Sequence, residues 1–113
     1  MLHKKRISKI NDVREDSQAL LNEGFYSQYG QDKFAASYFN NKTDGVFIDI
    51  GANDGVTFSN SYYFEKVLSW KGIAIEPIPD IFEQLKSVRS CYCENLCVSD
   101  YSGTTKFISV KGE

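Results

Sequence analysis

The ten residues VFIDIGANDG at positions 46–55 constrain the fold more than any other part of the sequence. Val46–Ile50 is a short, mainly apolar run rich in β-branched residues, which is typical of a strand buried on both faces. The turn Gly51–Gly55 follows this run, and Thr57–Leu68 has helical periodicity. In α/β proteins, the order strand, glycine turn, helix brings the backbone close to a nucleotide-like ligand.

The side chains around this turn indicate the kind of ligand. Gly51 and Gly55 stand four positions apart, so the GxGxxG pattern of dinucleotide sites is not met and a nicotinamide-binding unit is disfavoured. Two carboxylates, Asp49 and Asp54, suit a cation better than a phosphate. S-adenosylmethionine carries a sulfonium and an ammonium and no phosphate, and it is the leading candidate. The alternative is a tight strand-to-helix turn with solvated aspartates. The candidate cofactor-binding residues of this segment are Asp49, Gly51, Ala52, Asn53, Asp54 and Gly55.

A further acidic residue ends the next predicted strand. The run Gly72–Glu76 is short and apolar, and Pro77 stops it from continuing as a central strand. Ligands of open α/β sheets lie outside the carboxyl ends of the strands, where an acid accepts hydrogen bonds from ribose hydroxyls. We therefore expect Glu76 to bind the ribose with Pro77 beside it. The alternative is a capping or surface glutamate.

The rest of the chain is predicted to alternate between helices and strands. Helices are expected at 11–22, 32–39 and 79–89, and strands at 92–98 and 104–110, the last at a sheet edge. This alternation predicts parallel strands joined by right-handed crossovers. One face of the second helix is expected to carry its apolar side chains inward, namely Phe34, Ala35, Tyr38 and Phe39.

Four blocks of the sequence together resemble the FkbM family of S-adenosylmethionine-dependent methyltransferases. In the order of the family they are SQYGQDKFAASYF at 27–39, FIDIGANDGVTFSNSYYFEK at 47–66, WKGIAIEPIPDIFEQL at 70–85 and NLCVSD at 95–100. The resemblance implies a partial Rossmann-like class I methyltransferase fold of the α/β class, comprising the first three or four strands and their flanking helices. It divides the chain into a basic, helical extension at 1–25 and the N-terminal half of a methyltransferase domain at 26–113.

Further site residues follow only from this resemblance. Tyr29 and Gln31 are expected to contact the methionine part of the cofactor; the alternative is a loop leading into a helix capped by Asp32. Ser99 and Asp100 are expected near the adenine, with a simple turn as the alternative. The implied reaction is O-methylation of a hydroxyl on a sugar or natural product, so the partner is a small-molecule or glycan acceptor.

Composition and charge exclude several other classes of function. The net charge of −2 argues against a nucleic-acid-binding surface, and no apolar run predicts a membrane span. Cys91, Cys93 and Cys97 match neither a disulfide framework nor a zinc site, which predicts free thiols and a cytoplasmic location. His3 is the only histidine, so we expect no histidine-based catalysis and no metal site.

The sequence supplies no convincing base for the hydroxyl proton of an acceptor. We therefore expect no methyl transfer by this chain alone, and the alternative function is a non-catalytic fragment or a cofactor-binding module completed by another chain. The resemblance implies that the apolar strand Val46–Ile50 lies in the middle of a complete sheet. Within this chain one of its edges would be open and lack guarding charges, which predicts aggregation or self-association through that edge.

Overall fold

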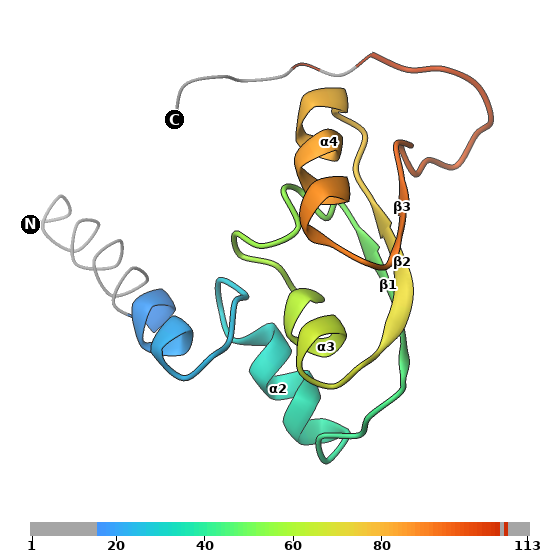
Figure 1. The fold of residues 1–113 in the computed structure, drawn as a ribbon. Coiled ribbons are helices and arrows are strands. Elements are labelled where there is room, and N and C mark those ends of the chain that lie inside the picture. The colour runs from blue at the N-terminus through green and yellow to red at the C-terminus, as the bar shows by residue number, and fades with distance from the viewer. Residues whose placement is uncertain (1–15, 107, 109–113) are drawn as a thin grey trace, which may run out of the picture.

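The computed structural model describes residues 16–106 and 108. Its centre is a three-stranded sheet of order β1-β2-β3, with the helices α3 and α4 on one side (Figure 1). Residues 16–22 are helical, and the elements that follow are α2 (Gln31–Tyr38), β1 (Val46–Ile50), α3 (Tyr62–Lys66), β2 (Lys71–Ile75), α4 (Pro79–Val88) and β3 (Tyr92–Glu94). None of the helices in these residues is both long enough and apolar enough to cross a membrane.

The sheet is parallel throughout, as the alternation of helices and strands predicted. β1 pairs with β2 so that Ile48 lies opposite Ile73, and β2 pairs with β3 so that Ile73 lies opposite Tyr92. Parallel neighbours need a crossover connection, which α3 and α4 provide. The carboxyl ends of all three strands therefore lie at the same edge of the sheet (Figure 1).

The helices cover their side of the sheet with two small apolar clusters. In one cluster, Leu85 of α4 packs with Ala52 and with Ala74 of β2. In the other, Ala36 of α2 packs with Phe64 and Leu68. Pro79 begins α4, where its fixed φ suits a first helical turn, so the predicted helix at 79–89 is confirmed with its end one residue earlier.

The prediction that Val46–Ile50 is buried on both faces is wrong for this chain. Val46, Ile48 and Ile50 are 76%, 68% and 61% exposed. Alternate residues of a strand point to the same face, and in the described residues no element covers the face that these three occupy. Only the other face, with Phe47 and Asp49, is half-buried.

The inward face predicted for the second helix is confirmed for Ala35, which packs against the cluster of Ala36, Phe64 and Leu68, but it is wrong for its three aromatic residues. In α2 the buried residues are Asp32 and Ala36, whereas Phe34 and Tyr38 are exposed. The Asp32 carboxylate accepts hydrogen bonds from Tyr26 N at 2.8 Å and from the Ser27 hydroxyl. A buried carboxylate must be hydrogen-bonded, and here the loop before α2 provides the donors. The polar side of α2 therefore packs against this loop.

Several predicted elements are shorter in the structure. The helix expected at 57–68 is only α3, because residues 56–61 are irregular and include the bridge at Phe58. The strand expected at 92–98 is only β3. No strand occurs among residues 104–106 and 108, and the rest of the fourth predicted strand lies outside the described residues. Of the helix predicted at 11–22, residues 16–22 are helical and 11–15 lie outside the described part.

Candidate functional site

The turn after β1 borders a cavity of about 210 Å³ at the carboxyl end of the strand. We call it the glycine-loop cavity. Its lining residues are Asp49, Gly51, Ala52, Asn53, Thr57, Phe58, Ser59 and Asn60. Four of the six residues predicted in this segment therefore lie at one cavity, and Asp54 and Gly55 do not line it.

Most backbone N–H groups of the turn are bonded to the protein itself. Gly51 N and Ala52 N each donate to Ile75 O at 2.9 Å, and Asn53 N donates to Glu76 Oε1 at 2.9 Å. Phosphate-binding turns direct such N–H groups at the ligand. The internal bonding here supports the expectation that the ligand is not a pyrophosphate.

The two glycines of the turn have different physical roles. Both have positive φ, +76° at Gly51 and +86° at Gly55. A Cβ atom added at Gly55 would lie 2.8 Å from Leu85 Cδ1, so this glycine allows α4 to pack closely on the turn. A Cβ atom at Gly51 would have no atom within 4 Å. Gly51 thus leaves open space at the glycine-loop cavity.

The two carboxylates predicted to face the ligand also differ. Asp49 lines the cavity, and its Oδ2 accepts a hydrogen bond of 2.5 Å from the Ser61 hydroxyl. Asp54 instead accepts bonds from Val56 N, Thr57 N and the Thr57 hydroxyl. Burial raises the pKa of the Asp54 carboxyl, but these hydrogen bonds lower it below its ordinary value. For Asp54, the structure agrees with the alternative of a turn-forming residue.

Glu76 lies directly after β2, at the carboxyl end predicted for it, and is only 5% exposed. Its Oε1 accepts from Asn53 N, and its Oε2 accepts from Ile78 N at 2.9 Å. The carboxylate therefore ties the glycine turn to the start of α4. The reading of Glu76 as a surface residue is wrong, and its bond to Ile78 N ties it to the residue just before α4.

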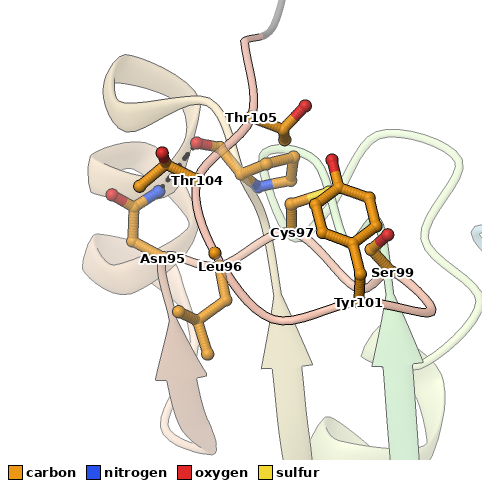
Figure 2. Close-up of a pocket in the computed structure, with 9 residues that line it drawn as sticks. Asn95, Leu96, Cys97, Ser99, Tyr101, Thr104 and Thr105 are labelled. Carbon is orange, nitrogen blue, oxygen red and sulfur yellow. Dashed lines mark hydrogen bonds between the residues drawn. The ribbon is translucent and has the colours of Figure 1, made fainter.

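A second cavity, of about 260 Å³, lies over the carboxyl ends of β2 and β3 and under the arc of residues 95–105 (Figure 2). It is lined by Pro77, Asn95, Leu96, Cys97, Ser99, Tyr101, Gly103, Thr104 and Thr105. The Asn95 side chain donates to the carbonyl oxygens of Glu76 at 2.9 Å and of Pro77 at 3.0 Å. Two predicted residues, Pro77 and Ser99, line this cavity, and Asp100 does not.

The two residues predicted to bind the methionine part lie elsewhere. Tyr29 lines a separate hollow beside the helical residues 16–22, and its N–H donates to Gln31 Oε1 at 2.9 Å. Neither Tyr29 nor Gln31 lines the glycine-loop cavity. Their loop approaches it through the bridge between Ser27 and Phe58.

Sequence reasoning missed Arg89, which is 6% exposed and donates a hydrogen bond to Ser59, a residue that lines the glycine-loop cavity. Its Nε donates to Glu65 Oε2 at 3.0 Å, and its Nη1 donates to Gly55 O at 3.0 Å. These partners are 24 and 34 positions away in the sequence. In the sequence, Arg89 is only a charged residue at the end of a helix, and no local pattern distinguishes it from a solvated arginine.

Glu65 is the buried counter-charge of Arg89, and it also accepts bonds from Ser90 N and Cys91 N. Burial raises the pKa of the Glu65 carboxyl, but hydrogen bonds from Cys91, Ser90 and Arg89 lower it to about 2. Burial, followed by the neighbouring Glu65 carboxylate, raises the pKa of the Cys91 thiol to about 12. Cys91 is therefore a protonated thiol at neutral pH.

In the described residues all three cysteines are free, and no cluster of acidic, cysteine or histidine side chains could hold a metal ion.

Comparison with known proteins identifies one family. The family model for the methyltransferase FkbM domain matches residues 49–112, which is more than half of the chain. The match covers the glycine-loop cavity, Glu76 and the cavity under residues 95–105. No curated protein and no solved structure matches the chain.

Proposed function

The chain belongs to the methyltransferase FkbM domain family, and from this membership we propose that it binds S-adenosylmethionine for methyl transfer to a hydroxyl group. The acceptor we propose is a sugar or natural product, free or within a glycan. The bound cofactor would supply a methyl group on a positively charged sulfur. The complete fold we propose is the Rossmann-like class I methyltransferase fold, with 26–113 as its N-terminal half and 1–25 as an extension. The free thiols are in keeping with a cytoplasmic location.

One observation carries this proposal: Asp49, near the end of β1, and Glu76, directly after β2, place their carboxylates at the carboxyl ends of adjacent parallel strands. They flank a turn in which the N–H groups of residues 51–53 are already bonded within the protein. Such a site favours a cationic, hydroxyl-bearing ligand over an anionic one. The open space at Gly51 leaves room for that ligand. The residues present therefore fit S-adenosylmethionine better than a dinucleotide.

Each part of the cofactor has a candidate partner. We assign the ammonium group to Asp49 and the adenine to the cavity of Pro77 and Ser99, with Asp100 beside it. We assign the ribose hydroxyls to Glu76, which lines neither cavity itself but lies between Asn53 of one and Pro77 of the other. The buried Glu76 oxygens each accept one protein N–H group, and a carboxylate oxygen can accept a further hydrogen bond. Tyr29 and Gln31 remain candidates for the methionine part from the neighbouring loop.

A second candidate function is a cofactor-binding module that a partner chain completes. The observation that favours it is the uncovered apolar face of the sheet, with Ile48 at 68% and Tyr92 at 71% exposed. An apolar surface of this kind normally meets another protein surface. Under this alternative, the cofactor site is the same but transfer requires the partner.

Titration calorimetry of the chain with S-adenosylhomocysteine, S-adenosylmethionine and NAD tests the proposed ligand. We expect both sulfur ligands to bind and NAD to bind at least tenfold more weakly, which is about 1.4 kcal/mol. Tighter binding of NAD would contradict the proposal. Transfer of labelled methyl groups to sugar acceptors then separates the enzyme from the binding module.

A pair of glycine variants locates the binding site. Gly51→Ala should weaken S-adenosylhomocysteine binding by about tenfold, because the added methyl group occupies open space at the cavity. Gly24→Ala is the control: Gly24 also has a positive φ, +93°, and open space around it, but it lines neither cavity. Equal effects of the two variants would mean that the ligand does not bind at the glycine turn.

A further inference from the structure

Arg89 makes more contacts with the segment after β1 than an ion pair with Glu65 would require. Besides the bond to Gly55 O, its Nη1 donates to the Ser59 hydroxyl at 3.4 Å and its Nη2 donates to the Ser61 hydroxyl at 3.0 Å. A single guanidinium from the end of α4 thus holds three points of the chain that borders the glycine-loop cavity. The planar fork of an arginine suits such multiple bonding.

The geometry of Arg89 leaves it little freedom to move. Its guanidinium carbon lies 5.6 Å from the ring centroid of Phe47 and 5.7 Å from that of Tyr62. Glu65 balances its charge from the remaining side. A cation held by two rings and a buried carboxylate has a fixed position, so the hydrogen bonds that it donates have fixed directions.

These directions determine the orientation of the Ser61 hydroxyl. A serine hydroxyl has one proton to donate and two lone pairs to accept with. Because Ser61 Oγ accepts from Arg89 Nη2, its proton is free to go to Asp49 Oδ2, 2.5 Å away. The bonds therefore run in one direction, from Arg89 through Ser61 to Asp49, the carboxylate that lines the cavity.

We propose that Arg89 is a positioning residue for the ligand, which acts through the Ser61 hydroxyl to hold the Asp49 carboxylate toward the glycine-loop cavity. This inference rests on the proposed function, in which Asp49 binds the ammonium group of the cofactor. Arg89 itself does not line the cavity. It also bonds Ser59, which does line the cavity, but the effect that it exerts through Ser61 is specific to the part of the ligand that Asp49 contacts.

That specificity allows a test with two ligands. S-adenosylhomocysteine carries the ammonium group, whereas 5′-deoxy-5′-methylthioadenosine has the same adenosine part without it. Ser61→Ala should weaken S-adenosylhomocysteine binding by about tenfold and methylthioadenosine binding by less than about twofold, because only the first ligand uses Asp49. Ser61→Thr keeps a hydroxyl and should restore most of the affinity for S-adenosylhomocysteine.

Arg89→Lys tests the arginine with less risk of unfolding than its removal. The lysine ammonium keeps the charge opposite Glu65, but it cannot reproduce the fork that reaches Gly55 O and Ser61 Oγ together. We expect a larger loss for S-adenosylhomocysteine than for methylthioadenosine, as in Ser61→Ala, with a smaller loss shared by both ligands because Ser59 also lines the cavity. The control is Ser87→Ala, which removes an exposed hydroxyl bonded to Gln84 O on the same helix and should change neither affinity.

The outcomes separate this inference from the proposed function. If the unmodified chain binds neither S-adenosylmethionine nor S-adenosylhomocysteine, the proposed function fails and the inference fails with it. If the unmodified chain binds both, but Ser61→Ala and Arg89→Lys weaken the two test ligands equally or not at all, only the positioning role is overturned. A selective loss in both variants, with rescue by Ser61→Thr, supports it.

Discussion

The two faces of the sheet differ more than any other two regions of the described molecule. One face of the sheet lies toward α3 and α4 (Figure 1). On that face Phe47 and Asp49 of β1 are half-buried, the Phe47 ring faces the Arg89 guanidinium, and Asp49 is linked to Arg89 through Ser61. On the opposite face, the alternate residues Val46, Ile48 and Ile50 are mostly exposed. The same five-residue strand therefore borders a buried polar network on one side and presents an apolar surface on the other.

This difference separates two roles within one small sheet. The covered face carries the charges that shape the candidate site, and each of them is hydrogen-bonded, as burial requires. We call the opposite face the bare face, defined by Val46, Ile48, Ile50, Ile73 and Tyr92. Its apolar surface, together with the open edge of β1, suits contact with another polypeptide.

The largest effect is expected from removing the cation of the covered face. Arg89→Ala removes four hydrogen bonds and leaves Lys66, whose Nζ lies 3.3 Å from Glu65 Oε2, as the remaining cation beside that carboxylate. We expect this variant to lower the free energy of unfolding by about 3–5 kcal/mol. Urea denaturation followed by Trp70 fluorescence measures this loss. The control is Lys33→Ala, which breaks the Lys33–Glu23 pair, 50% exposed on both sides, and should cost at most about 1 kcal/mol. Similar losses in both variants would mean that the interactions of Arg89 stabilise the fold no more than an exposed ion pair does.

The next largest effect is expected from shortening an apolar side chain on the covered side of the sheet, compared with the same change on the bare face. Leu85→Ala removes a side chain that is 0% exposed and should cost about 2–5 kcal/mol. Ile48→Ala on the bare face should cost less than about 1 kcal/mol in the monomer, because its side chain is already in water. The same denaturation experiment at low protein concentration compares them. A large loss for Ile48→Ala would show that the bare face is covered in solution.

Self-association tests the bare face directly. We expect the chain to associate as its concentration rises, and Ile48→Lys should reduce the association constant at least tenfold, because it places a charge in the contact. Light scattering over a concentration series measures the change. Leu21→Lys, at an exposed apolar residue of the helical segment 16–22, is the matched control and should leave association unchanged. A chain that stays monomeric at all concentrations would contradict the prediction.

The smallest effect is the dependence of the covered face on pH. The pKa of Glu65 is about 2 in the folded chain and 4.5 in its ordinary state. Because the folded pKa is the lower one, the stability that Glu65 contributes is present above pH 4.5 and is lost as the pH falls toward 2. We expect a loss of about 1–2 kcal/mol after solvent screening. Urea denaturation at several pH values in this range gives the free energy of unfolding as a function of pH. This free energy should change less with pH in Glu65→Gln than in the unmodified chain. An equal change in both would assign the loss to other carboxylates.

Patterns within the sequence determined the main elements and the position of the candidate site. The run Val46–Ile50, the turn at Gly51–Gly55 and the helix from Pro79 follow from local preferences, which act between residues close in sequence. The location of Glu76 at a carboxyl end follows from the alternation of strands and helices. For the same reason the α/β class and the parallel sheet were predictable, whereas the exact ends of α3 and β3 were not.

The tertiary structure alone decided which faces are covered and which polar groups meet. Periodicity tells which residues share a face, but not whether another layer lies over that face, so it predicted burial for the exposed side chains of β1 and α2. The sequence pattern also gave Asp49 and Asp54 the same role. In the structure Asp49 lies at the cavity, whereas Asp54 is hydrogen-bonded within its own turn. Arg89 meets Gly55 and Ser61 only after α4 has packed on the sheet, because 34 and 28 positions of chain separate them. Bonds between residues so far apart depend on how the elements pack, and no local sequence pattern encodes them.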